Sequence, residues 1–171
     1  MMDRGEIMQA QLHTRLNGDI VDFNKVEKCY KEPILGGDRI GGFWTSSYNE
    51  EYGSDWLQKK MYKPHIHVFQ GYLYKIKDGV KIYNINNFSD EQQFKSFYKS
   101  DYNEVAKDFH CLHLNHEYLN LCANEYNYHT KRSNFYLWFV ECTWWFNTDY
   151  LILDRIIDGS ELSKMANIKI Y

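Results

Sequence analysis

The chain has 171 residues, of which 18% are aromatic, and its formal net charge is −3. A chain of this length and composition buries enough apolar surface to exclude intrinsic disorder, and it predicts a single domain over residues 1–171. The basic residues are scattered, unlike the footprint of a dedicated nucleic-acid binder, and no apolar run reaches the roughly 20 residues that a membrane helix needs.

The first strand is predicted near the N-terminus. Residues 7–16 alternate between apolar and polar side chains, as a half-buried strand does. The polar side includes His13 and Arg15, and the other side includes Leu12 and Leu16. The start of the chain, MMDRGEIMQAQ, lacks the apolar core of a signal peptide, so we expect a cytoplasmic protein.

Turn and capping residues organise the next part of the chain. Asp22 is placed to cap a short helix that ends near Cys29. A loop that contains Pro33 and two glycine pairs then leads to FWTSS, residues 43–47. The flanking glycines predict that this backbone passes close to another group.

A helix and a hairpin are expected next. Ser54 can cap a helix through Lys60, which the following proline prevents from continuing. Residues 65–76 and 80–85 alternate on either side of an Asp-Gly pair at 78–79, which predicts a β-hairpin.

Short helices and strands fill the second half of the chain, and their starts are predicted from capping residues and apolar patterns. We expect a helix capped by Ser89 with Gln92, a helix capped by Asp101 with Glu104 that runs to Asp108, the strand FHCLHL, a helix from His116 to Glu125, a helix capped by Ser160, and an edge strand NIKIY.

Residues 135–146 (FYLWFVECTWWF) are apolar on both faces of a strand, which predicts a central strand covered on both sides. Helices and hairpins alternate without regular βαβ units. The sequence therefore predicts an α+β fold with a mixed, largely antiparallel split sheet flanked by short helices.

Glu141 is the most informative side chain of this apolar run, because it is the only charged one between Phe135 and Asn147. Burying a lone carboxylate costs several kcal/mol, so the group must be paired inside the protein or face a cleft. A structural carboxylate would be satisfied by an Arg, a Tyr or a backbone amide. We favour a cleft.

Three parts of the chain together resemble the site of ADP-ribosyltransferases, and most closely that of phage and bacterial small proteins of this superfamily. They are a polar Arg or His on the first strand, an aromatic-Thr-Ser strand, and a Glu on a late strand. The stretches that carry the resemblance are GGFWTSSYNEEYGSDWLQKK, YNEVAKDFHCLHL and ECTWWFNTDYL. The resemblance implies an ADP-ribosyltransferase-like domain that consumes NAD, needs no metal and modifies a macromolecular acceptor, possible acceptors being a host or defence component.

The resemblance implies a role for Glu141, which would bind the ribose 2′-hydroxyl of NAD and stabilise positive charge at the anomeric carbon. Phe139 stands where the arginine-directed branch has an acid or Gln, so the acceptor stays open. The implied NAD-binding residues are Arg15 or His13 for the phosphates or ribose, Thr45, Ser46 and Ser47 for the nicotinamide ribose or the carboxylate, and Phe43 or Trp44 for the nicotinamide.

Two other functions remain open. A non-enzymatic inhibitor or binding protein could keep this fold without turnover. A small nuclease-type toxin could use His113 or His116 as general acid or base. We interpret the histidines at 65 and 67, and those at 110, 113 and 116, as core-edge or surface residues in preference to metal ligands.

Overall fold

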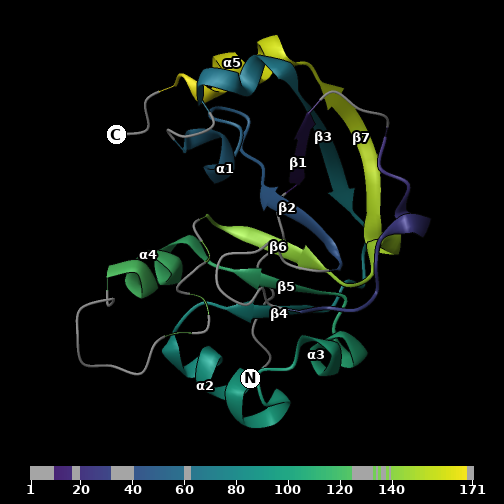
Figure 1. The fold of residues 1–171 in the computed structure, drawn as a ribbon, viewed down its shortest axis with the longest axis vertical. Coiled ribbons are helices and arrows are strands. Elements are labelled where there is room, and N and C mark those ends of the chain that lie inside the picture. The colour runs from purple at the N-terminus through teal and green to yellow at the C-terminus, as the bar shows by residue number, and fades with distance from the viewer. Residues whose placement is uncertain are drawn as a thin grey trace. The chain divides into compact units, whose positions relative to one another are not determined.

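The computed structural model describes residues 10–16, 20–31, 41–59, 63–124, 133, 135, 138 and 140–168. The described chain is mixed α+β, as expected, and holds seven strands and a few short helices (Figure 1). It packs as two compact units. Unit 1 takes its described residues from Met1–Val21, Thr45–Asp78 and Asp149–Tyr171, and unit 2 from Asp22–Trp44 and Gly79–Thr148.

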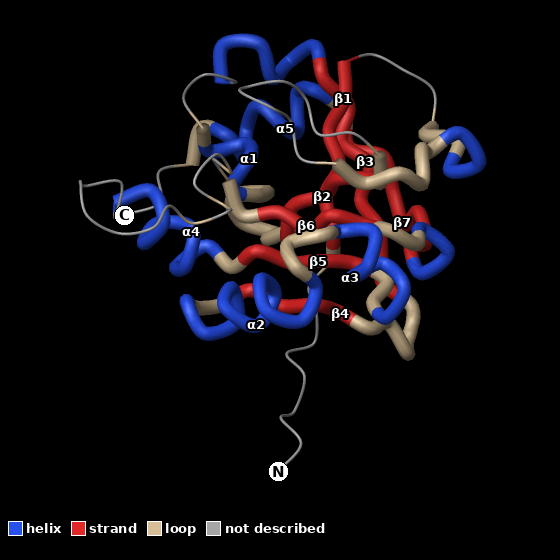
Figure 2. The backbone as a smooth tube through the Cα atoms, turned by 60° about the horizontal axis from the view of Figure 1, so that its bottom comes forward, coloured by secondary structure: helices blue, strands red, loops and turns tan. Residues whose placement is uncertain are grey.

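Unit 1 is built on antiparallel strands in the order β2, β1, β3, β7 (Figure 2). Their bounds are β1 Gln11–Leu16, β2 Phe43–Ser47, β3 Phe69–Ile76 and β7 Leu151–Ile157. β1 pairs with β3 along its whole length, from Gln11 opposite Tyr74 to Leu16 opposite Phe69. The first strand was therefore predicted correctly from Gln11 onward, and residues 7–9 lie outside the described part.

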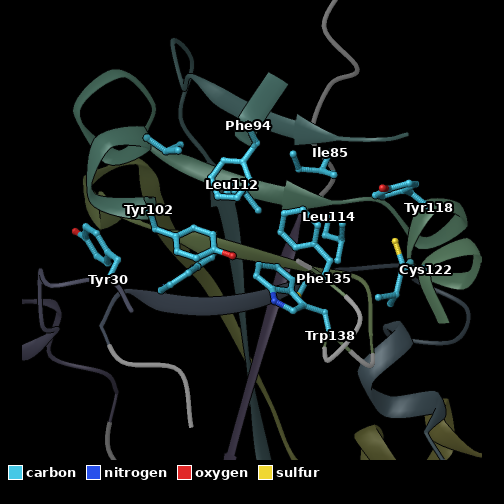
Figure 3. Packing of buried hydrophobic residues seen from close by; sticks show 14 of the residues in the cluster. Tyr30, Ile85, Phe94, Tyr102, Leu112, Leu114, Tyr118, Cys122, Phe135 and Trp138 are labelled. Atoms are coloured by element: carbon cyan, nitrogen blue, oxygen red, sulfur yellow. The ribbon is translucent and has the colours of Figure 1, made fainter. Parts of the chain in front are cut away.

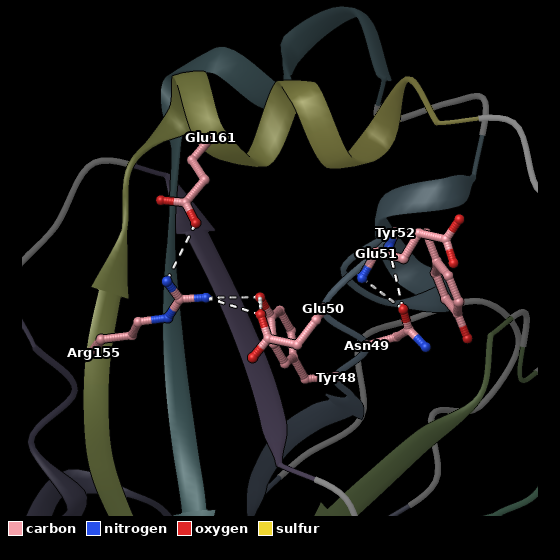
Figure 4. Close-up of polar contacts among 7 residues, drawn as sticks. All are labelled: Tyr48, Asn49, Glu50, Glu51, Tyr52, Arg155 and Glu161. Atoms are coloured by element: carbon pink, nitrogen blue, oxygen red, sulfur yellow. Dashed lines mark hydrogen bonds and ion pairs between the residues drawn. The ribbon is translucent and has the colours of Figure 1, made fainter.

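One face of this sheet carries an apolar cluster that packs against helix α5 (Gly159–Ala166) and helix α1 (Asp55–Gln58). Its most buried members are Leu57, Ile66, Ile157 and Leu162, all at 0% exposure. At the rim of the unit, Arg155 on β7 donates to the hydroxyl of Tyr48 at 2.8 Å and to Glu161 of α5 at 3.4 Å (Figure 4). These contacts join the end of β2 to β7 and α5.

Unit 2 has a mixed sheet of β4 (Ile82–Ile85), β5 (Cys111–Leu114) and β6 (Cys142–Trp145). β5 pairs parallel with β4 and antiparallel with β6. Its helices are α2 (Phe88–Tyr98), α3 (Tyr102–Asp108) and α4 (His116–Asn124). Figure 3 shows the core of this unit, in which Ile85, Leu112 and Leu114 of the strands meet Phe94, Tyr102 and Tyr118 of the helices.

The predicted hairpin is wrong. β3 begins at Phe69, after a 3₁₀ helix over Lys63–Val68, and it pairs with β1 and β7 on its two edges. No edge of β3 is left for the strand that follows the Asp-Gly turn. That strand, β4, pairs with β5 in unit 2. β7, which supplies the second partner of β3, was not predicted.

The long strand predicted over 135–146 is also wrong, since among the described residues of this range only Cys142–Trp145 form a strand. The amide of Trp138 donates to the carbonyl of Phe135 at 2.9 Å. Both side chains are buried in the core of unit 2, which explains the apolar run without a strand. Residues 134, 136, 137 and 139 lie outside the described part.

The helix caps were predicted with mixed success. Asp22 and Asp101 cap as expected, by accepting from the amides of Asn24 and Asn103. The helix after Asp22 is a 3₁₀ turn over Phe23–Lys25, shorter than expected. Two other helices start earlier than predicted, because the caps are Asn87 in place of Ser89 and Asp158 in place of Ser160.

Several smaller predictions concern segments that the structure describes only in part. Ser54 precedes α1 but makes no capping hydrogen bond, and α1 ends at Gln58. Asn167 and Ile168 follow α5 without forming a strand, and the rest of the predicted edge strand, like the loop around Pro33, lies outside the described part. All four cysteines are free thiols. None of the helices seen in the described residues is long and apolar enough to cross a membrane.

Gly42 leads the chain into β2 with a φ of +68°, and a Cβ there would lie 2.2 Å from Nε1 of Trp144. Gly79 has a φ of +80° but no atom within 4 Å of such a Cβ. We expect Gly79→Ala to lower the free energy of unfolding by about 1–2 kcal/mol, because alanine disfavours a positive φ. Gly42→Ala should cost about 1–3 kcal/mol more, because the added Cβ also collides with Trp144. Urea denaturation followed by tryptophan fluorescence measures the difference, and equal losses would contradict the packing around Gly42.

Candidate functional site

Glu141 lies immediately before β6 in unit 2 and is 6% exposed. Its Oε1 atom lies 3.4 Å from Nδ1 of His113 on β5. One partner of this carboxylate is thus a histidine, which was not among the partners expected of a structural carboxylate. A buried acid beside a titratable imidazole is an arrangement typical of acid–base or charge-stabilising chemistry.

Strand register brings the two groups together. His113 of β5 stands opposite Thr143 of β6, and residues directly opposite in an antiparallel pair share a face. Nδ1 of His113 lies 3.0 Å from the hydroxyl of Thr143. Glu141 precedes Thr143 by two residues, so strand alternation places it on the same face. The neighbouring residues Leu112 and Trp144 point to the other face and belong to the core.

The His113–Thr143–Glu141 cluster is therefore held from behind by the core of unit 2. Thr143 is fully buried, and the side chains of His113 and Glu141 are 17% and 8% exposed. Charges act more strongly at such a place than in water, because the local dielectric is low. The cluster can hold an ionised carboxylate, donate a hydrogen bond through the imidazole, and accept one from a hydroxyl group.

The hydroxyl residues of β2 divide between the two faces of the unit 1 sheet. Thr45 donates to Oε1 of Gln11 at 2.6 Å, and Nε2 of Gln11 donates to Ser47 at 3.3 Å. Ser46 stands opposite Leu12, whose side chain lies in the apolar cluster. Thr45 and Ser47 therefore share a face with Gln11, while Ser46 lies on the opposite face.

The residues proposed for phosphate contact, His13 and Arg15, lie on the same face as Gln11, because they follow it at two-residue steps along β1. Arg15 is exposed, and the ring of His13 lies 6.3 Å from that of Tyr72. Burial raises the pKa of the neighbouring Tyr74 to about 12, reinforced by Tyr72 and opposed by the positive charge of Arg15. The face thus carries a guanidinium and an imidazole, with the buried side chains of Tyr72 and Tyr74 beside them.

The two aromatic residues expected to contact nicotinamide pack within unit 2. Phe43 is 4% exposed, and its ring lies 5.0 Å from that of Phe23 in an edge contact. Trp44 stacks on Trp144 at 4.6 Å with an interplanar angle of 22°. Trp44 keeps partial exposure, whereas Phe43 is buried. Of the two, only Trp44 has surface to offer a ligand.

The histidine groups do not form a metal site in the described part of the chain. His65 and His67 lie in the 3₁₀ helix over Lys63–Val68, not on a strand as we expected. His110 accepts from the amide of Lys81 through Nδ1, and burial lowers its pKa. No group of three or more His, Cys, Asp or Glu side chains gathers around a common point among the residues described.

Sequence reasoning missed the residues that hold the candidates in place. Gln11 was placed on the polar side of the first strand but was not connected to Thr45 and Ser47. Thr143 was not singled out, and His113 was not connected with Glu141. Each of these pairs joins two strands that are distant in sequence. Whether the two residues meet depends on the strand register, which local sequence patterns do not contain.

Comparison of the chain with protein-family models, with curated proteins and with solved structures finds no match. Any functional conclusion therefore depends on the residues of this chain and their geometry.

Gln11 is fully buried and bonded to two hydroxyls of β2, so its removal should be costly. We expect Gln11→Leu to lower the free energy of unfolding by about 1–3 kcal/mol, because the buried hydroxyl of Thr45 loses its acceptor. Adding Thr45→Val should return part of the loss, since both polar partners are then gone. Urea denaturation of the single and double variants measures these free energies of unfolding. If the loss in the double variant equals the sum of the losses in the two single variants, the pairing of Gln11 with Thr45 is contradicted.

Proposed function

We propose that this protein is an NAD-dependent mono-ADP-ribosyltransferase, with Glu141 as its catalytic carboxylate and a macromolecule as its acceptor. One observation carries the proposal: a buried carboxylate, placed by β6 and in contact with His113, lies in a chain whose motifs resemble that superfamily. A phage or bacterial effector acting on a host or defence component is the role that this resemblance implies.

The reaction breaks the bond between the anomeric carbon of the ribose and the nicotinamide nitrogen. The bonding electrons leave with nicotinamide, and a nucleophile of the acceptor attacks the same carbon and loses a proton. The transition state resembles an oxocarbenium ion, which a fixed carboxylate stabilises. Glu141 supplies this negative charge and accepts a hydrogen bond from the ribose 2′-hydroxyl.

For the other parts of NAD, the candidates implied by the resemblance are residues of β1 and β2. The exposed guanidinium of Arg15 has the forked donors that phosphate oxygens prefer, and His13 lies two residues before it on the same face. Ser47 shares that face and keeps partial exposure, which makes it a better candidate for a ribose than Ser46 or Thr45, both of which are buried. We assign nicotinamide stacking to Trp44, because Phe43 is buried.

The contact between His113 and Glu141 also favours a second function. An imidazole beside a carboxylate is suited to general acid–base catalysis, so a nuclease-type toxin that cleaves RNA without NAD is the second candidate. His116, the other histidine considered for that role, begins α4 and lies 2.9 Å from the amide nitrogen of Asn120. His113 is therefore the only one of the two that we connect with Glu141.

The test is incubation of the protein with labelled NAD and cell lysate. We expect label to be transferred to a macromolecule by the wild type, and transfer to fall about 100-fold or more in Glu141→Gln, which keeps the shape of the side chain but loses its charge. The matched control is Glu104→Gln on α3, an exposed glutamate of the same unit that pairs with Lys107. This control should label like the wild type.

Three results would contradict the proposal. Labelling that survives Glu141→Gln would exclude this residue as the catalytic carboxylate. Release of free ADP-ribose without a labelled acceptor would indicate a glycohydrolase. RNA cleavage in the absence of NAD would favour the nuclease. Thermal unfolding of each variant, followed by circular dichroism, separates lost chemistry from lost folding.

A further inference from the structure

The contact between His113 and Glu141 has an unequal geometry. Nδ1 of His113 lies 3.0 Å from the hydroxyl oxygen of Thr143 and 3.4 Å from Oε1 of Glu141. One ring nitrogen thus faces two oxygens on the same side. Which of them it binds depends on where the imidazole proton is.

The charge of the carboxylate decides between the tautomers. A bare Nδ1 would accept from Thr143 and turn its lone pair toward an anionic oxygen, which is repulsive. A protonated Nδ1 donates to Thr143 and attracts Glu141, and the hydroxyl proton of Thr143 is then directed elsewhere. With Glu141 ionised, the arrangement with the proton on Nδ1 is the more stable.

We propose that His113 is a positioning residue for Glu141: its Nδ1–H, aligned by Thr143, holds the carboxylate in one orientation at the start of β6. This inference rests on the proposed function for its catalytic consequence but not for the contact itself. Glu141 lies one residue before β6, whose pairing with β5 begins at Cys142. His113, by contrast, is fixed by β5, whose neighbours on both edges are β4 and β6.

The charged and titratable groups close to the cluster in sequence and register are few. Asn84 of β4, which stands beside His113 in register, carries no charge, and Cys111 of β5 stays a thiol because burial raises its pKa. None of the described strands β4, β5 and β6 contains a charged residue.

Two substitutions of similar shape test this role. Asn can place its side-chain amide N–H where Nδ1–H of His113 stands, whereas Leu has the shape of Asn without a donor. We expect kcat for NAD turnover to fall about 100-fold in His113→Leu with KM little changed, because a misplaced catalytic group affects the chemical step. His113→Asn should recover most of kcat. Equal loss in both variants, or no loss in His113→Leu, would overturn the proposal.

A second measurement does not need catalysis. In a double-mutant cycle of His113→Leu and Glu141→Gln, we expect the effects on the folding equilibrium constant to deviate from additivity by about tenfold, as for residues in contact. Additive effects would overturn the positioning role. If the wild type turns over no NAD but the coupling is found, the proposed function fails while the pairing of His113 with Glu141 stands.

Discussion

The packing of Trp144 is the interaction on which unit 2 depends. This fully buried side chain stacks on Trp44, meets the edge of Tyr30 at 6.0 Å and donates from Nε1 to the carbonyl of Gly41 at 2.9 Å. Because alternate residues of a strand face opposite sides, fixing Trp144 in the core also fixes Thr143 on the other face. The packing of Trp144 on β6 therefore helps to determine both the apolar core and the position of the polar cluster with His113 and Glu141.

The strands of unit 1 also alternate between two faces, but here a hydrogen-bonded amide takes the place of the packed tryptophan. Leu12 and Gln11 are neighbours on β1, and both are buried. Leu12 joins the apolar cluster, while Gln11 fixes Thr45 and Ser47 through its two amide atoms. A hydrogen-bonded amide at this position sets the register of β1 against β2, since a slip by one residue would bury it among apolar groups. The face that carries His13 and Arg15 is thereby determined.

Local features of the chain were predictable where local chemistry decides them. Asp101 and Asp22 cap because a carboxylate accepts from the nearby amides, and β1 alternates because one side is apolar. Pairing was not predictable: the Asp-Gly turn after β3 is typical of a hairpin, yet β1 and β7 already occupy both edges of β3. For the site, Glu141 was singled out as a candidate by its isolation among apolar residues, whereas its contact with His113 depends on the register of β5 with β6.

Unit 2 holds a second buried carboxylate, Glu91, whose contacts can be compared with the contact of Glu141 to His113. Glu91 is fully buried, receives hydrogen bonds from Tyr118 and Ser133 at 2.5 and 2.6 Å, and pairs with Lys95. Its short contacts join α2, α4 and the segment at Ser133, which is a structural task. Glu141 instead meets a titratable ring at 3.4 Å across neighbouring strands. Under the proposed function, the contact with His113 orients the carboxylate in the ground state, and the stronger interaction forms with the positive charge of the transition state.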